Sequence, residues 1–278
     1  MRLGIHIPLK GGFAANLMRA KEYGCETIQL FAGNPTAWKM APPNVVEIEK
    51  RAVLAREQSI YPVVIHCAYL VNLATRSPDF HEKSVQLLGE TMQRAALHGA
   101  PYVVLHTGNH GGAGVEEGLE QIIETIDGAL PKWPDGVKLL LENTAGSGTA
   151  LGSSFEELAR ILKSFPPYTL GICLDTAHGW AAGYDFGTAD GVKMLLEQFE
   201  RLIGLGSLYL LHLNDAKVAR GSRVDRHEHI GRGQIGRDGF RELLRQPWPE
   251  GMPVILETPD IGSEWDRRNL KAVRSLLL

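Results

Sequence analysis

Eight short apolar runs, separated by longer amphipathic runs, are the feature of this 278-residue chain that most constrains its fold. Continuous runs of Val, Ile and Leu are typical of strands buried on both faces, as in a parallel sheet. Eight strand–helix alternations over this length favour a single-domain (β/α)8 TIM barrel over an open doubly wound sheet. The expected strands are Leu3–Ile7, Thr27–Phe31, Pro62–Ile65, Tyr102–Leu105, Val137–Leu141, Leu170–Leu174, Leu208–Leu213 and Val254–Leu256, and the expected helices include Val45–Glu57, Phe80–His98, Val115–Leu130, Phe155–Leu162 and Val192–Leu202.

We expect residues 1–278 to form one domain, because no stretch has the composition of a domain linker. The first expected strand is followed by the turn Lys10-Gly11-Gly12 and by no GxGxxG nucleotide fingerprint. Three well-separated cysteines outside any CxxC pattern predict no disulfide framework and a reducing compartment. No apolar run approaches the length of a membrane span, so we expect a cytoplasmic protein without a membrane partner.

The net charge of −3 lacks the basic excess of most nucleic-acid binders. One stretch is nevertheless basic, and it contains Lys217, Arg220, Arg223, Arg226, Arg232 and Arg237. Charge alone favours a solvated surface loop there, and the alternative is a patch that faces a phosphate backbone. The segment from about 214 to 236 is also the longest irregular region expected, and loops of that length usually carry function.

The strongest functional signal is the residue type at the ends of six consecutive expected strands. In a barrel these ends converge on the face where active sites lie. Any one such side chain is more often structural, but burying six ionisable groups after apolar strands is costly unless metal ions compensate them. Their types suit Zn²⁺, Mn²⁺ or Fe²⁺. They are His66, His106, Glu142, Asp175, His212 and Glu257.

Further candidate ligands follow the sixth and seventh strands. Asp175 and His178 would lie one turn apart if a helix begins there. Asp225, His227 and His229 would point the same way in an extended segment, and their spacing does not choose between the two histidines. Six strand-end groups with His178, Asp225 and one histidine make nine ligands, which exceeds the four of one zinc site and suits a cluster of three ions.

Several of these motifs together resemble the endonuclease IV family, the trinuclear-zinc abasic-site DNA endonucleases of base excision repair. The matching runs are HCAYLVNLA (66–74), LENTAGSGTALG (141–152), CLDTAHGWAAGYD (173–185), HLNDAKVARGSRVDRHEHIGRGQIG (212–236) and ILET (255–258), and the similarity extends over nearly the whole chain.

The resemblance implies how the nine ligands divide among the ions. His66 and His106 would bind one zinc and share Glu142 with the second. Asp175, His212 and Glu257 would complete the second site. The third would consist of His178, Asp225 and His227, which chooses His227 over His229 by analogy.

The resemblance also implies the reaction. Hydroxide generated at the three metals would attack the phosphodiester 5′ to an abasic site and leave a 3′-hydroxyl and a 5′-deoxyribose phosphate. The same site would clean blocked 3′ ends, Glu142 and Glu257 would be catalytic, and the protein would act as a monomer on double-stranded DNA. Mn²⁺ or Fe²⁺ could replace zinc at some sites.

The expected DNA contacts are Tyr69, Leu70, Asn34, Arg223 and Arg226. Tyr69 and Leu70 match the family loop that holds the duplex open, a task to which an aromatic beside an apolar wedge is suited. The sequence departs from the family at Thr36, where a DNA-penetrating arginine is expected, and the nearby Lys39 could replace only its charge.

Two other classes of function compete with this interpretation. A divalent-metal sugar isomerase or epimerase on the same barrel would need Glu142, Asp175, His212 and Glu257, but not the five additional ligands. A non-catalytic protein that binds damaged DNA would not need nine ligands around open coordination positions. Fold alone does not choose among them, because TIM barrels host many chemistries.

Overall fold

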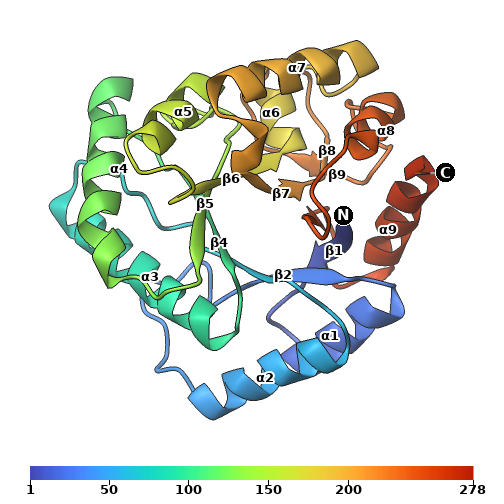
Figure 1. The fold of residues 1–278 in the computed structure, drawn as a ribbon, viewed down its shortest axis with the longest axis horizontal. Coiled ribbons are helices and arrows are strands. Elements are labelled where there is room, and N and C mark those ends of the chain that lie inside the picture. The colour runs from blue at the N-terminus through green and yellow to red at the C-terminus, as the bar shows by residue number, and fades with distance from the viewer. Residues whose placement is uncertain (278) are drawn as a thin grey trace.

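The computed structural model describes residues 1–277, and its centre is a closed barrel of eight parallel strands. Neighbouring strands follow the order β1-β10-β7-β6-β5-β4-β3-β2, so each strand pairs with its predecessor and the first pairs with the last (Figure 1). This architecture confirms the predicted (β/α)8 barrel. The barrel strands are β1 (Arg2–His6), β2 (Thr27–Phe31), β3 (Val63–His66), β4 (Tyr102–His106), β5 (Lys138–Glu142), β6 (Gly171–Asp175), β7 (Leu208–His212) and β10 (Pro253–Leu256).

A ring of helices surrounds the strands (Figure 1). Side-chain oxygens of Asn44, Ser77, Ser154 and Thr188 each accept a hydrogen bond from a first-turn N–H, which fixes where four of these helices begin. The α-helices are α1 (Phe13–Glu22), α2 (Val45–Glu57), α3 (Pro78–Leu97), α4 (Val115–Ala129), α5 (Phe155–Lys163), α6 (Thr176–Ala182), α7 (Ala189–Leu202), α8 (Arg237–Arg245) and α9 (Glu264–Leu277), and the 3₁₀ turns are η1 (Leu130–Lys132) and η2 (Leu205–Ser207).

The apolar core has two parts. The larger part lies between the barrel strands and the helices. The smaller part fills the inside of the barrel, and we call it the apolar layer: Val64, Val104, Leu140, Cys173, Leu210 and Ile255, all fully buried. Because each of these residues precedes a strand-end His, Asp or Glu by two positions, the two-residue period of a strand places that ligand candidate on the same inward face.

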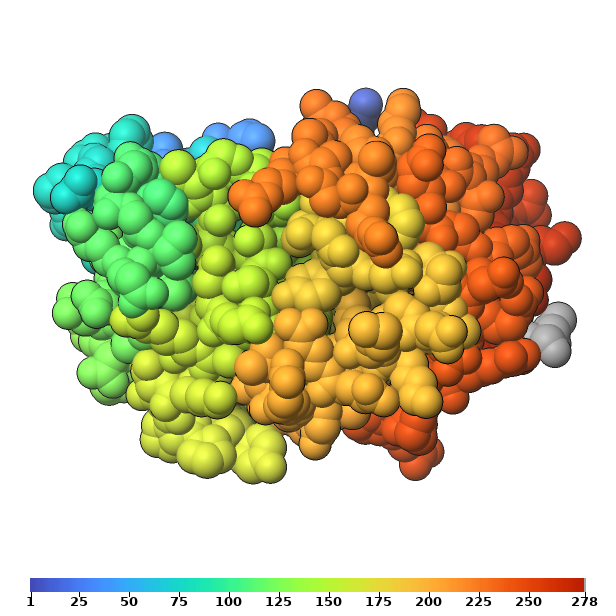
Figure 2. Space-filling view, turned by 90° about the horizontal axis from the view of Figure 1, so that it is seen from above, coloured from blue at the N-terminus to red at the C-terminus, as the bar shows by residue number. Residues whose placement is uncertain are grey.

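The segment from 214 to 236 is more ordered than the sequence predicts. Two short strands, β8 (Asp215–Ala216) and β9 (His227–Glu228), pair in antiparallel fashion within it. The buried carboxylate of Asp215 accepts main-chain N–H bonds from Gly231, Gly233 and Ile235. In Figure 2 the orange part of the chain that includes this segment stands at one edge of the molecule. Among residues 1–277, no helix is both long and apolar enough to cross a bilayer.

Candidate metal centre

The carboxylate of Glu142 lies at the centre of the strand-end groups. Its Oε2 is 3.2 Å from His66 Nε2 and 3.0 Å from His106 Nε2, and its Oε1 is 2.9 Å from His212 Nδ1. The side chain is completely buried. His66, His106 and Glu142 have ligand atoms close enough to share one ion, which is the grouping that the family resemblance implies.

A second group shares Glu142 and adds the ends of three further strands. Ligand atoms of Glu142, Asp175, His212 and Glu257 lie within 4.8 Å of one another. His212 Nδ1 is 3.1 Å from Glu257 Oε2 and 3.9 Å from Asp175 Oδ2. A carboxylate that belongs to both groups can bridge two cations.

The third group forms where β6 runs into α6. Asp175 caps this helix, because its Oδ1 accepts the main-chain N–H of His178 at 2.7 Å, so the condition under which the two side chains lie one turn apart is met. Ligand atoms of Asp175, His178 and His227 cluster within 4.8 Å. Asp225 joins them, with Oδ2 3.3 Å from His178 Nε2 and Oδ1 3.4 Å from His227 Nε2.

Four of the histidines donate one ring N–H to a carbonyl oxygen. His66 Nδ1 lies 2.7 Å from Cys67 O, and His178 Nδ1 lies 3.0 Å from Asn143 O. His227 Nδ1 lies 2.9 Å from Glu257 O, and His212 Nε2 lies 2.8 Å from Gln29 Oε1. When the ring is neutral, these bonds leave the other ring nitrogen of each histidine with a lone pair, which can hold a proton or a metal ion.

Those free nitrogens face carboxylates, which are acceptors themselves. His227 Nε2 is buried and has no hydrogen-bond partner, although a carboxylate oxygen of Asp225 is only 3.4 Å away. Asp225 is itself half exposed, but a buried acceptor nitrogen that faces a carboxylate needs a proton or a cation between them. Metal-binding histidines are typically oriented by an N–H bond to a carbonyl or carboxylate, so the donor set fits divalent ions.

The protonation equilibria of the ligand groups respond to the same crowding. Burial alone would lower the pKa of His178 and His212, but the surrounding carboxylates outweigh it and raise both pKa values well above the ordinary value. Burial alone would raise the pKa of Glu142 and Glu257, yet neighbouring histidines hold both far below the usual range. Protons therefore compete with metal ions for this site.

His227 and His229 point in different directions, so the expectation that both align with Asp225 is wrong for His229. Strand β9 ends at Glu228, and the chain turns there, with Arg232 N–H donating to His229 O. The alternation of side chains ends with the strand. His229 instead stacks on Trp265, with ring centroids 3.8 Å apart.

The sequence interpretation missed two polar residues from the first two strands. Gln29 donates to Glu257 Oε1 at 2.6 Å and accepts from His212 Nε2. His6 Nδ1 lies 3.5 Å from the same Glu257 oxygen. A fully buried glutamine inside an apolar strand was the available signal, since such a group needs partners. Both residues contact ligand candidates, His6 from the end of β1 and Gln29 from the middle of β2.

Comparison with known proteins identifies the family. The family described as xylose isomerase-like TIM barrel matches residues 17–276. A protein of Natranaerobius thermophilus named probable endonuclease 4 is 42% identical over 100% of this chain and 98% of its own length. A protein of Methanoculleus marisnigri with the same name is 41% identical over 99% and 98%.

The chain belongs to the endonuclease IV family.

The structures agree with this membership. Endonuclease IV from Thermus thermophilus superposes with a TM-score of 0.86 at 36% identity, covering 100% of this chain and 99% of that one. A D-tagatose 3-epimerase-like protein superposes at 0.77 with 18% identity over 100% and 97%, which shows a shared fold only. The predicted family and enzyme class, an endonuclease, are confirmed.

Two of the residues predicted to contact DNA, Tyr69 and Leu70, line a cleft together with metal-ligand candidates. A cleft of about 820 Å³ is lined by Trp38, Tyr69, Leu70, His106 and His178, among others. The Tyr69 side chain is 61% exposed, and its ring meets Phe31 edge-on. The structure therefore brings the predicted wedge loop to the same opening as the ligands.

The other three predicted contacts are exposed. Asn34 Oδ1 accepts from the N–H and hydroxyl of Thr36, so these two side chains stabilise their own turn. Arg226 donates to Asp225 O, and Arg223 O accepts from Ser147. Neither guanidinium has a carboxylate within 4 Å in the described part of the chain.

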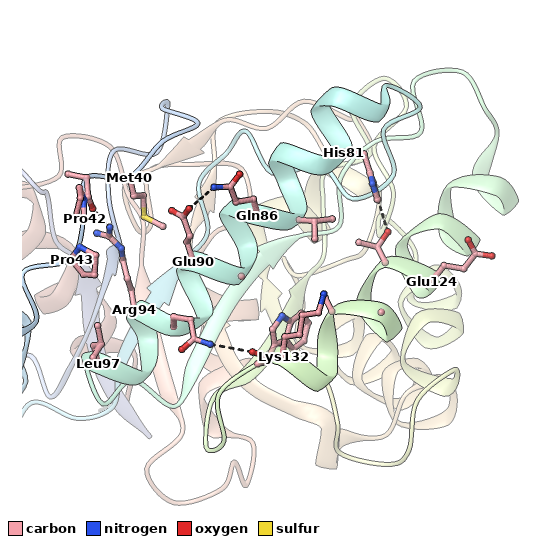
Figure 3. A pocket seen from close by; sticks show the side chains of 18 residues that line it. Met40, Pro42, Pro43, His81, Gln86, Glu90, Arg94, Leu97, Glu124 and Lys132 are labelled. Atoms are coloured by element: carbon pink, nitrogen blue, oxygen red, sulfur yellow. Dashed lines mark hydrogen bonds between the residues drawn. The ribbon is translucent and has the colours of Figure 1, made fainter.

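A second hollow of about 850 Å³ lies outside the barrel between α3 and α4 (Figure 3). Its polar side chains mostly satisfy one another: His81 Nε2 lies 2.8 Å from Thr125 Oγ1, and Gln86 donates to Glu90. Within residues 1–277 it contains none of the grouped metal ligands. We therefore place the chemistry at the mouth of the barrel and not in this hollow.

Proposed function

We propose that this protein is a DNA-repair endonuclease that hydrolyses the phosphodiester 5′ to abasic sites in double-stranded DNA and leaves a 3′-hydroxyl and a 5′-deoxyribose phosphate. One observation carries the proposal. Buried acceptor nitrogens and carboxylates face each other in three adjoining groups, and no lysine or arginine of residues 1–277 lies within 4 Å of Glu142, Asp175 or Glu257.

The donor set suits Zn²⁺ at three sites, and Mn²⁺ or Fe²⁺ would also be accepted by imidazole and carboxylate ligands. His66, His106 and Glu142 would hold one ion, and Glu142 with Asp175, His212 and Glu257 a second. His178, Asp225 and His227 would hold the third. Bound ions of this kind lower the pKa of water and neutralise charge on phosphoryl oxygens.

The protein side chains fix the geometry in which that chemistry can occur. Glu142 contributes one carboxylate to two groups, so its removal would affect both. Glu257 is held from three directions: Gln29 and His6 contact Oε1, while its main-chain N–H donates to Asn214 Oδ1. Ligands positioned in advance need no reorganisation when charge develops on the substrate.

Recognition of the abasic site would come from the wedge loop and the basic rim. Tyr69 and Leu70 project at the cleft beside His106 and would fill the space of the missing base, because a site without a base is cheap to unstack. Arg223 and Arg226 would contact phosphates, and Asn34 would shape the neighbouring loop. We further propose removal of blocking groups from 3′ ends at the same centre, and that residues 1–278 act as one domain, as a monomer in the cytoplasm.

A sugar isomerase or epimerase remains the second candidate, because the epimerase-like structure shares the fold. The second metal group alone would serve such a reaction. The third group and the exposed Tyr69 argue against it, since neither is needed to move protons on a small carbohydrate.

A nicking assay tests the proposal. Metal-loaded protein is incubated with an end-labelled duplex that carries one tetrahydrofuran abasic analogue, before and after stripping by a strong chelator. We expect metal-dependent cleavage on the 5′ side of the analogue with a 3′-hydroxyl end. Absence of cleavage by folded, metal-loaded protein, together with turnover of a ketose in a panel of sugars, would replace the proposal with the isomerase.

A further inference from the structure

An aromatic ring that two arginines contact lies close to the metal ligands in the sequence, where the 214–236 segment meets α9. The guanidinium carbons of Arg232 and Arg268 are 4.6 and 4.9 Å from the centre of the Trp265 indole. His229 covers one face of that indole at an interplanar angle of 11°. We name Arg232, Trp265 and Arg268 the arginine–indole patch. It has no role in the function proposed above.

The support beneath the patch is rigid. Asn269 donates to His229 Nδ1 at 3.1 Å and to Thr258 Oγ1 at 2.8 Å, and its own Oδ1 accepts from the N–H of Ile230 at 3.1 Å. Asp260 Oδ2 lies 3.7 Å from His229 Nε2, so this carboxylate faces the histidine. The histidine that stacks on the indole is therefore held by hydrogen bonds before any ligand arrives.

The two guanidiniums are exposed and uncompensated. No carboxylate of residues 1–277 lies within 4 Å of Arg232 or Arg268, whereas the adjacent Arg267 pairs with Glu264 at 2.6 Å. Both charges lie within 5 Å of one ring centre, so they are at most about 10 Å apart. Like charges gathered on one ring repel unless an anion joins them.

We propose that the arginine–indole patch binds backbone phosphates of the DNA strand that leaves the catalytic cleft. A guanidinium stacked on an aromatic ring keeps its N–H edge free for the two-point contact with phosphate that arginine favours. Phosphates along one strand of a duplex follow at about 3.4 Å of axial rise, so about 10 Å spans a few of them. His229 is two residues beyond His227, which joins the patch to the third metal group along the chain. The inference rests on the proposed function and extends its DNA-binding surface.

Two double variants test the patch. R232Q/R268Q removes its charges, and R201Q/R245Q is the matched control. Arg201 and Arg245 are also exposed and lack a carboxylate within 4 Å, but they lie in the last turns of α7 and α8, at the opposite end of the barrel. Binding of the metal-loaded proteins to undamaged and abasic-analogue duplexes is measured by fluorescence anisotropy over a series of salt concentrations.

For R232Q/R268Q we expect the Kd to rise about tenfold or more at low salt on both duplexes, and the slope of log K against log salt to fall by about 0.9 for each lost phosphate contact. The thermal midpoint and the kcat at saturating abasic DNA should stay at wild-type values, while KM rises. Equal Kd values and equal salt slopes for the two double variants would overturn the proposal that the arginine–indole patch binds DNA phosphates.

The outcomes separate this inference from the proposed function. If the wild type nicks abasic DNA but the two double variants bind alike, only the patch fails. If the wild type binds duplex through the patch but does not nick, only the proposed reaction fails. A wild type that does not bind duplex DNA at all would overturn both.

Discussion

Two layers of side chains inside the barrel differ in chemistry although they are only two residues apart. The apolar layer and the ligand layer above it come from the same six strands, as in Leu140 and Glu142 of β5 or Val104 and His106 of β4. The apolar layer is completely buried, whereas in the ligand layer His106 is 33% exposed and Glu257 15%. One layer stabilises the fold by excluding water, and the other holds buried charge that only cations or protons compensate.

The contrast separates stability from function on a single strand. A change in the apolar layer should lower the free energy of unfolding and leave metal binding and chemistry intact. A change in the ligand layer should remove chemistry and leave the fold intact.

Loss of one carboxylate from the ligand layer should have the largest effect. Glu142→Gln or Glu257→Gln keeps the side-chain volume and removes the negative charge that neighbouring histidines face. We expect kcat on abasic DNA to fall by about 10³-fold or more, with a thermal midpoint near that of the wild type. Near-normal turnover in either variant would contradict the catalytic role assigned to that residue.

Truncation in the apolar layer should give the opposite pattern. Leu140→Ala leaves a cavity in a fully buried position and should lower the free energy of unfolding by about 2–5 kcal/mol. Metal content and kcat at 25 °C should stay near wild-type values. Denaturant titration and metal analysis of the same preparation check both parts, and loss of bound metal in this variant would show that the layers are coupled.

A residue that orients ligands should have an intermediate effect. Gln29→Leu removes the acceptor of His212 Nε2–H and the donor to Glu257. We expect metal affinity to fall about 10–100-fold, as measured by competition with a chromophoric chelator. Leu140→Ala serves as the control from the apolar layer. Equal affinities in both variants would mean that Gln29 only fills space.

The smallest expected effect is on how the free energy of unfolding varies with pH, which should depend on the ligand layer and not on the apolar layer. In metal-stripped protein, the raised pKa values of His178 and His212 contribute stability that is present below the ordinary histidine pKa and is lost as pH rises through their folded values. The lowered pKa values of Glu142 and Glu257 contribute stability above the ordinary carboxyl range that is lost as pH falls through their folded values.

Stripped protein should therefore lose stability above neutral pH, whereas loaded protein should lose its metal as pH falls, because protons displace the ions. Leu140→Ala should lower the stripped curve without changing its shape. Urea unfolding at a series of pH values from 6 to 9 tests this, and a flat curve for stripped wild type would contradict it.

Much of the fold and ligand set could be predicted from sequence because both depend on local periodicity. Continuous apolar runs indicate buried strands, and the strand end fixes which face a following His66 or Glu142 joins. The structure gathers all nine predicted ligands at one mouth. The turn after Glu228 could not be predicted, since it depends on contacts of His229 with Trp265 and Asn269 from the other end of the chain.

Hydrogen bonds between side chains of distant strands of the barrel could not be predicted either. Gln29 is 183 positions from His212 and 228 from Glu257, and only barrel closure brings them together. The pairing of Asp215–Ala216 with His227–Glu228 likewise depends on tertiary hydrogen bonds to the Asp215 carboxylate. Sequence periodicity carries no information about contacts of that range.

Metal stoichiometry tests the central claim most directly, namely that the ligand layer is a three-metal centre. Protein purified without chelator and dialysed against metal-free buffer is analysed by inductively coupled plasma mass spectrometry, with His227→Ala beside the wild type. We predict about three divalent ions per chain in the wild type and about two in His227→Ala, whose third group loses one ligand. One ion or none in active wild-type protein, or equal content in both proteins, would contradict the three-metal centre.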